Sequence, residues 1–92
     1  MRELQFTAKF KKDYKRAKRQ GKNLGKLEAV LELLVREEEL PEALRDHSPG
    51  GTYKGHRECH IEPDWLLIYR IDEEGLVLVA TRTGSHSELL GL

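Results

Sequence analysis

Residues Trp65-Leu66-Leu67-Ile68-Tyr69 place five large apolar side chains in a row, within a chain of 92 residues of which 35% are charged. Successive side chains of a strand point to opposite faces of its sheet, so an unbroken apolar run is typical of a strand buried on both faces. We therefore predict a central strand at residues 65–71, with helices covering one side of the sheet.

Two further strands are predicted on either side of this run, at residues 53–61 and 76–83. Between the strands, Glu62-Pro63-Asp64 and Asp72-Glu73-Glu74-Gly75 have the composition of tight turns, which join consecutive strands as antiparallel hairpins. Upstream of the first strand, Asp46-His47-Ser48-Pro49-Gly50-Gly51 has the composition of a loop.

The N-terminal half is predicted to form a short strand, residues 3–6, followed by two helices. Thr7 can cap the first helix, because its hydroxyl accepts a hydrogen bond from an otherwise unpaired amide. Gly21 is expected to end this helix, and Pro41 to bar extension of the second, which begins near Asn23 or Leu24. Apolar residues recur with helical spacing in both segments: Phe10, Tyr14 and Ala17 in the first, and Leu27, Val30, Leu31, Leu34 and Val35 in the second.

These elements predict an α+β fold, with residues 1–92 forming a single domain. The N-terminal strand and helical hairpin would pack on a mainly antiparallel, twisted sheet. No apolar run approaches the ~20 residues that span a bilayer, the N-terminus starts no apolar signal segment, and the lone Cys59 cannot form an internal disulfide. We therefore expect a soluble, cytoplasmic protein with no room for a buried large cofactor.

The charges are segregated, although the formal net charge is zero. Between residues 9 and 22, Asp13 is the single acid among many basic residues, and such a block can attract phosphate because its field acts locally. The alternative is that these side chains are only the solvated face of a surface helix. The basic residues are Lys9, Lys11, Lys12, Lys15, Arg16, Lys18, Arg19 and Lys22.

All four histidines, His47, His56, His60 and His86, fall in the C-terminal half. Strand alternation predicts that His56 and His60 share a face with Lys54 and Glu58, and that Arg82 shares a face with Leu78 and Ala80. If the strands pair as hairpins, His60, Asp64, Arg82 and His86 can converge at one end of the sheet.

Such a set has the residue types that metal-free RNA cleavage needs. A base removes the proton of the 2′-hydroxyl, an acid protonates the 5′-oxygen, and histidine serves in either role near neutral pH. An arginine fork matches the oxygens of a phosphate. Residue types alone leave open that the histidines are structural, and that Trp65 and Tyr69 either stack on bases or pack in the core. A zinc site built on Cys59 and His60 is disfavoured, since adjacent strand residues point to opposite faces.

Several blocks together resemble the YafQ branch of the RelE/ParE toxin superfamily, and the resemblance covers nearly the whole chain in order. The most specific blocks are residues 60–69, HIEPDWLLIY, taken together with residues 82–86, RTGSH. The supporting blocks are YKGHRE at residues 53–58, DHSP at residues 46–49 and FKKD at residues 10–13.

This resemblance implies a metal-independent endoribonuclease without a cofactor, which cuts mRNA in the ribosomal A site. Its implied partners are the ribosome, mRNA and a cognate antitoxin with a ribbon–helix–helix domain, through which alone it would meet DNA; no membrane is implied. His86 matches the general acid, His60 or His47 the base or a charge-stabilising group, and Arg82 the residue that holds the phosphate. The implied catalytic residues are His47, His60, Asp64, Arg82 and His86; those for substrate are Lys54, Trp65 and Leu90; those for ribosomal RNA are Lys11, Lys12, Lys15, Arg16 and Lys18.

Two departures from the family pattern leave alternatives open. Leu90 stands where an aromatic residue often closes the site, and His56 stands where tyrosine is common. A catalytically weak interaction module, acting as antitoxin partner and operon corepressor, is therefore the alternative function. A third possibility is gyrase poisoning, as in relatives that share this fold, although those proteins do not need the histidine set.

Overall fold

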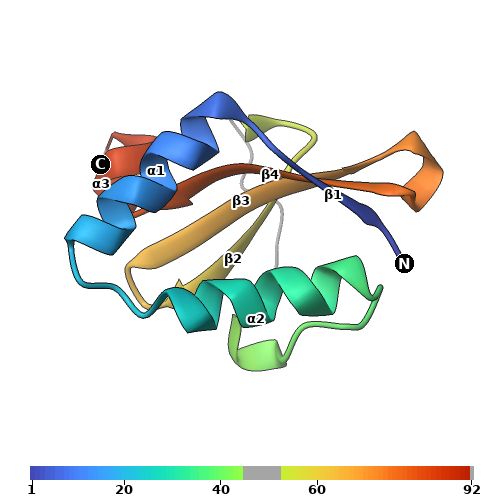
Figure 1. Cartoon of the computed structure of the whole chain (residues 1–92), viewed down its shortest axis with the longest axis horizontal. Coiled ribbons are helices and arrows are strands. Elements are labelled where there is room, and N and C mark those ends of the chain that lie inside the picture. Colours follow the sequence, from blue (N-terminus) through green and yellow to red (C-terminus); the bar gives the residue numbers. More distant parts are fainter. Residues whose placement is uncertain (45–52, 92) are drawn as a thin grey trace.

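The computed structural model describes residues 1–44 and 53–91. Its strands are β1 (Glu3–Phe6), β2 (Arg57–Glu62), β3 (Trp65–Asp72) and β4 (Val77–Gly84), and its helices are α1 (Ala8–Arg19), α2 (Leu24–Val35) and α3 (His86–Leu90) (Figure 1). Short 3-10 turns, η1 (Glu42–Leu44) and η3 (Glu73–Gly75), complete the described elements. The predicted loop at residues 46–51, which includes His47, lies outside the described residues.

The strands form one mixed sheet in the order β1-β4-β3-β2. β3 pairs antiparallel with both β2 and β4, which confirms the predicted central strand and its two hairpins. β1 instead pairs parallel with β4, from Glu3 opposite Val77 to Phe6 opposite Ala80. The long connection from β1 to β4, which includes α1, α2, β2 and β3, makes this parallel pairing possible, since a hairpin turn cannot join parallel strands.

The predicted caps of the helical hairpin are present. The Thr7 hydroxyl accepts a hydrogen bond of 3.0 Å from the Phe10 amide, and the Asn23 side chain caps α2. Gly21 follows α1 in the left-handed conformation, with φ of 74°, as a helix-ending glycine does. α2 does not reach Pro41: it ends at Val35, ahead of a left-handed turn at Glu37.

Two apolar clusters explain why β3 is apolar on both faces. On one face the helices α1 and α2 pack on the sheet, with Leu27 and Phe10 against Leu67 and Tyr69. On the other face, Leu66 and Ile68 pack against Leu89 of α3. Each large side chain buried in this way contributes about 1.5–3 kcal/mol to folding. The main core is therefore on the helical-hairpin side, and α3 covers the opposite side.

The predicted start of the strand at residues 53–61 requires correction. Residues 53–55 form a turn, with Gly55 at φ of 84°, so β2 begins only at Arg57 and His56 precedes it. The alternation that placed His56 and Lys54 on one face with His60 therefore does not apply. The short helix α3 was not predicted. Among the described residues, no helix is long and apolar enough to cross a membrane.

Candidate functional site

The short helix α3 places His86 at its first position. Ser85 precedes it as the N-cap: its hydroxyl accepts a hydrogen bond from the Glu88 amide, and the Glu88 carboxylate accepts one of 2.8 Å from the Ser85 amide. This capping box satisfies two amides that a helix start leaves unpaired. The backbone bond from Ser85 is also the main cause that lowers the pKa of Glu88. His86 therefore sits on a fixed helix start.

Asp64, in the turn between β2 and β3, holds the His86 ring from the other side. One carboxylate oxygen lies 3.0 Å from the His86 amide nitrogen and 2.7 Å from its Nδ1. The bond from the His86 backbone, followed by that from its ring, lowers the pKa of Asp64, which stays ionised at neutral pH. Because Nδ1 faces Asp64, Nε2 is the ring nitrogen left for proton exchange with a ligand.

His60 brings a second imidazole to the same place. It lies on β2 opposite Leu66, and its ring centroid is 5.5 Å from that of His86. Two histidines at this separation can serve as acid and base on one substrate, which is the pairing that the sequence predicted. The convergence of His60, Asp64 and His86 at one end of the sheet is therefore confirmed.

Arg82 lies on the same face of the sheet as His60, because a register shift turns it toward that face. The β3–β4 register shifts between Ile68 and Tyr69, so that Ala80 is opposite Tyr69 whereas Arg82 is opposite Ile68. Arg82 therefore lies over the same face as Ile68 and not with Leu78 and Ala80, and the predicted face was wrong. The guanidinium binds Asp13 of α1, and this bond is the main cause that raises the pKa of Arg82.

Trp65 lies at the base of the site. Its side chain is 1% exposed, its indole Nε1 donates a hydrogen bond of 2.9 Å to the Thr83 hydroxyl, and the Lys22 ammonium lies 5.5 Å from its ring centroid. The ring is thus mainly a core side chain that also lines the pocket between the β2–β3 turn and α3. The prediction that Trp65 contacts substrate stays a prediction.

The other predicted substrate residues are more accessible. Leu90 is half-buried against the cluster of Leu66, Ile68 and Leu89, and Lys54 is exposed in the turn before β2. His56 contacts the Tyr53 ring edge-on, with centroids 6.0 Å apart. His47 lies outside the described residues, so its predicted role stays a prediction.

The basic helix divides into two groups. Lys11, Lys12, Lys15 and Lys18 are exposed, as an RNA-binding surface requires. Arg16 instead turns inward: it pairs with Asp13 and Glu88, each at 3.1 Å, and donates a hydrogen bond to the Thr83 carbonyl. Its assignment to an RNA-binding set is therefore corrected, because its donors are already used within the protein.

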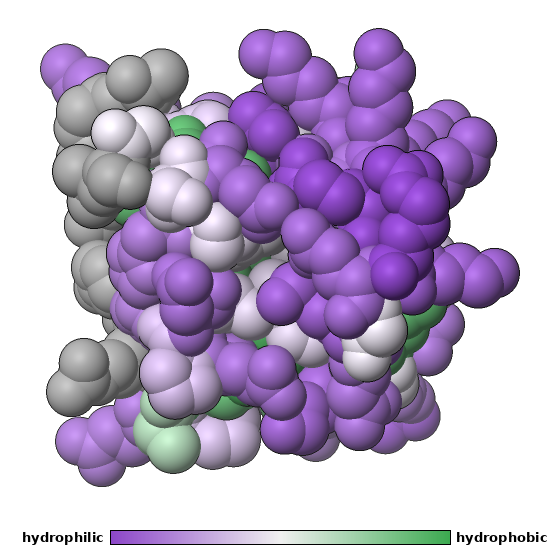
Figure 2. Space-filling model, turned by 90° about the vertical axis from the view of Figure 1, so that its left-hand side faces the viewer, coloured by the Kyte–Doolittle hydropathy of each residue, from purple (hydrophilic) through white to green (hydrophobic). Residues whose placement is uncertain are grey.

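The end of the molecule that carries α3 and the β2–β3 turn is predominantly hydrophilic (Figure 2). A pocket of about 310 Å³ opens there, lined by residues of the α1–α2 connection, the β2–β3 turn and α3, among them Lys22, Asp64 and Glu88. Within the described residues, no group of three or more His, Cys, Asp or Glu side chains could hold a metal ion. The His86 ring lies beside this pocket, because its Nδ1 contacts Asp64 of the pocket wall at 2.7 Å.

The sequence as a whole agrees with this geometry. Residues 2–91 match the family of bacterial toxins of type II toxin–antitoxin systems called YafQ. The chain belongs to the YafQ toxin family.

Relatives of this YafQ-family toxin cover its full extent. The mRNA interferase toxin YafQ of Escherichia coli K12 is 36% identical over 91 residues, which are 98% of this chain and 97% of that protein. The crystal structure of YafQ from E. coli BL21(DE3) has a TM-score of 0.91 at 35% identity, and covers 99% of this chain and 100% of that one. The matching chain in the crystal structure of the E. coli DinJ–YafQ toxin–antitoxin complex has a TM-score of 0.88 at 36% identity. The match covers 98% of this chain and 98% of that one. These structures confirm the α+β fold.

Sequence reasoning on this YafQ-family chain missed two supporting acids. The spacing Ser85-x-x-Glu88 is a readable capping-box signal for the start of α3. Asp13 follows Phe10 by three residues and precedes Ala17 by four, so helical spacing already put it on the buried face of α1. An acid on an apolar helix face, in a segment otherwise basic, indicates a buried partner for an arginine.

Proposed function

We propose that this chain, acting as one toxin domain of the RelE-like type, is an mRNA interferase that cuts mRNA in the ribosomal A site without a metal ion. The observation that carries the proposal is the His86 ring, oriented by Asp64 and facing His60 at 5.5 Å. A relative with 36% identity is named an mRNA interferase toxin, which supports the same activity here.

In the proposed reaction His60 acts as the base. It removes the proton of the 2′-hydroxyl, the 2′-oxygen attacks the adjacent phosphorus, and the bond from phosphorus to the 5′-oxygen breaks. His86 donates a proton from Nε2 to that leaving oxygen, which gives a 2′,3′-cyclic phosphate and a 5′-hydroxyl. Asp64 fixes the ring of His86 and stabilises its protonated form electrostatically, as a carboxylate does for a catalytic histidine. Each positioned acid or base contributes about 10²–10⁴ in rate.

Arg82 is proposed to stabilise the charge that develops on the phosphate oxygens. Its Nε and one Nη2 hydrogen face Asp13, so the opposite edge of the guanidinium remains directed away from that carboxylate. Hydrogen bonds to a developing anion act most strongly when the donor is already held in place. Leu90 packs against Leu66 and Ile68 of this face, and Lys54 is exposed in the turn before β2; both are proposed to contact the flanking nucleotides.

The direct test is to map mRNA 5′ ends across the transcriptome after brief induction of the wild type and of His86→Ala. We expect new ends phased to the reading frame in the wild type and none in the variant. Growth arrest without new ends would indicate another target, such as gyrase. Neither arrest nor new ends, with antitoxin binding retained, would favour the catalytically weak interaction module.

Lys11, Lys12, Lys15 and Lys18 are proposed to contact phosphates of ribosomal RNA. Each phosphate contact that is lost should reduce the slope of log affinity against log salt by about 0.7–0.9. Replacing Lys12 and Lys18 with alanine should therefore lower the slope for ribosome binding by about 1.5, measured by sedimentation over a salt series. Arg36→Ala, which removes an exposed cation paired with Glu32 on α2, is the control and should leave the slope unchanged. An unchanged slope in the double lysine variant would contradict the assignment.

We also propose that a cognate antitoxin neutralises this toxin, since a relative of the same fold was crystallised as a complex with the DinJ antitoxin. The antitoxin would carry a ribbon–helix–helix domain, and the toxin would reach operator DNA only through it. Purified toxin should then bind operator DNA only when the antitoxin is added.

A further inference from the structure

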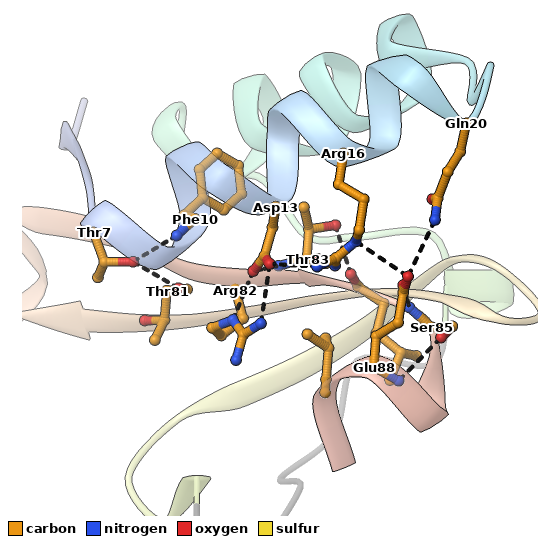
Figure 3. A network of polar contacts seen from close by, with 12 residues as sticks. Thr7, Phe10, Asp13, Arg16, Gln20, Thr81, Arg82, Thr83, Ser85 and Glu88 are labelled. Carbon is orange, nitrogen blue, oxygen red and sulfur yellow. Dashed lines mark hydrogen bonds and ion pairs between the residues drawn. The ribbon is translucent and has the colours of Figure 1, made fainter. Parts of the chain in front are cut away.

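Within residues 1–44 and 53–91, the second half of β4 has one edge that no strand covers. β1 pairs with β4 only as far as Ala80, so residues 81–83 continue without a strand on that side. Side chains from α1, and from Thr7 just before it, instead form hydrogen bonds with the backbone of this edge (Figure 3). The Thr7 hydroxyl donates to the Thr81 carbonyl at 2.7 Å, Arg16 donates to the Thr83 carbonyl at 3.2 Å, and Asp13 accepts from the Thr83 amide at 3.2 Å.

Asp13 is the centre of this contact. Asp13 is only 2% exposed, yet its carboxylate contacts four hydrogen-bond donors. Arg82 Nε lies 2.6 Å from one oxygen and Arg82 Nη2 lies 2.9 Å from the other, while Arg16 Nη1 and the Thr83 amide complete the set. A buried carboxylate is costly unless it is paired and hydrogen-bonded, and here two arginines supply the pairing.

The two-point contact with Arg82 fixes the plane of its guanidinium. An arginine side chain that is free in solvent loses rotamer entropy when it is held in one geometry. Asp13 imposes that geometry before any ligand binds. The outer edge of the Arg82 guanidinium, the edge opposite Nε and Nη2, then has a fixed direction.

We propose that Asp13 is a positioning residue for RNA cleavage, acting through Arg82 by presenting the outer edge of its guanidinium to the scissile phosphate. This inference rests on the proposed function, because it needs Arg82 to contact that phosphate. Asp13 itself does not touch the RNA: it is buried behind Arg82, on the helix side of the β4 edge. Helix α1 would therefore position Arg82 through Asp13, and the exposed lysines of the same helix are proposed to bind the ribosome.

The test is Asp13→Asn, which keeps the shape of the side chain but removes its charge and one acceptor for the Arg82 fork. The rate constant and KM are measured on programmed ribosomes, in the wild type and in an Arg82→Ala background. We expect a fall of about 10–100-fold in kcat with KM nearly unchanged, since a small misplacement of a catalytic group has effects of this size. In the Arg82→Ala background the same substitution should have no further effect on kcat.

Asp72→Asn is the matched control, because Asp72 also binds an arginine, Arg70, at 2.7 Å but lies at the far end of β3. It should leave kcat unchanged. If Asp13→Asn does not fold, Asp13→Glu retains the charge and displaces the fork, and it should lower kcat by about tenfold or more. Thermal unfolding measured on every variant separates loss of folded protein from loss of rate.

Equal losses of kcat in both backgrounds, or wild-type kcat in a folded Asp13→Asn protein, would overturn the inference. Failure of the proposed function looks different, because the wild-type protein itself would then leave mRNA on the ribosome uncut. The NMR signal of the Arg82 Nε–H group provides a readout that does not depend on activity. We expect it to be rigid and slow to exchange in the wild type and mobile in Asp13→Asn; an equally rigid signal in the variant would overturn the positioning role.

Discussion

Replacing His86 with glutamine is expected to lower the rate constant of cleavage on the ribosome by about 10²–10⁴. Glutamine is similar in size and can still donate a hydrogen bond to Asp64, but it cannot deliver a proton to the leaving oxygen. Binding should be retained, so KM should change little while kcat falls. Single-turnover cleavage of a defined mRNA on purified ribosomes measures both quantities.

Asp64→Asn is the informative companion variant. It removes the charge that faces the ring, while the His86 backbone can still donate to the amide oxygen, so a smaller loss of about 10–100-fold is expected. The lowered pKa of Asp64 keeps it ionised as the pH falls from 7 to 5. A change in wild-type activity over that interval should therefore not come from protonation of Asp64. Wild-type kinetics in folded His86→Gln would contradict the proposed role of His86.

The second large effect concerns stability. Trp65→Ala is expected to lower the free energy of unfolding by about 3–5 kcal/mol, the usual cost of truncating a buried tryptophan. Trp65 is 1% exposed, and its indole donates to the Thr83 hydroxyl, which in turn donates to the Leu66 carbonyl at 2.7 Å. Small domains have a total stability of about 5–15 kcal/mol, so much of it would be lost. Urea denaturation followed by circular dichroism measures the change.

Two further variants complete this test. Trp65→Phe keeps a ring in the core and loses the indole hydrogen bond, so it should cost less than the alanine variant. Leu76→Ala removes an apolar side chain that is 66% exposed and should change stability by less than about 0.5 kcal/mol. A Trp65→Ala protein as stable as Leu76→Ala would show that the ring is not part of the core.

The parts of the fold that follow from local patterns were predictable. The apolar run at residues 65–69, the Thr7 cap and Gly21 each act through their immediate neighbours, and each was found where predicted. The parallel pairing of β1 was not predictable in this way, because it joins opposite ends of the chain. The register shift near Tyr69 is equally invisible in the sequence, and it moves Arg82 from one face of the sheet to the other.

The candidate site was predictable to a similar degree. Asp64 and His86 each lie next to a turn or strand end, and simple hairpin geometry brings them together. For Trp65 the sequence left base stacking and core packing open, because only tertiary packing decides between them, and the ring is found 1% exposed in the core. Arg16 was placed in the RNA-binding set because its partner Glu88 lies on α3, 72 positions later, although its other partner, Asp13, stands three residues before it on α1.

The parallel pairing of β1 with β4 also determines when the protein can become active. Glu3 pairs with Val77, 74 positions later, and Asp13 binds Arg82, 69 positions later. Contacts of such high contact order form late in folding, because long loops must close before the contacts can stabilise the chain. During synthesis α1 and α2 leave the ribosome first, long before the strand that completes their sheet. His60, Arg82 and His86 can therefore come together only after α3 has been made, so we expect a nascent chain that ends before α3 to have no competent site.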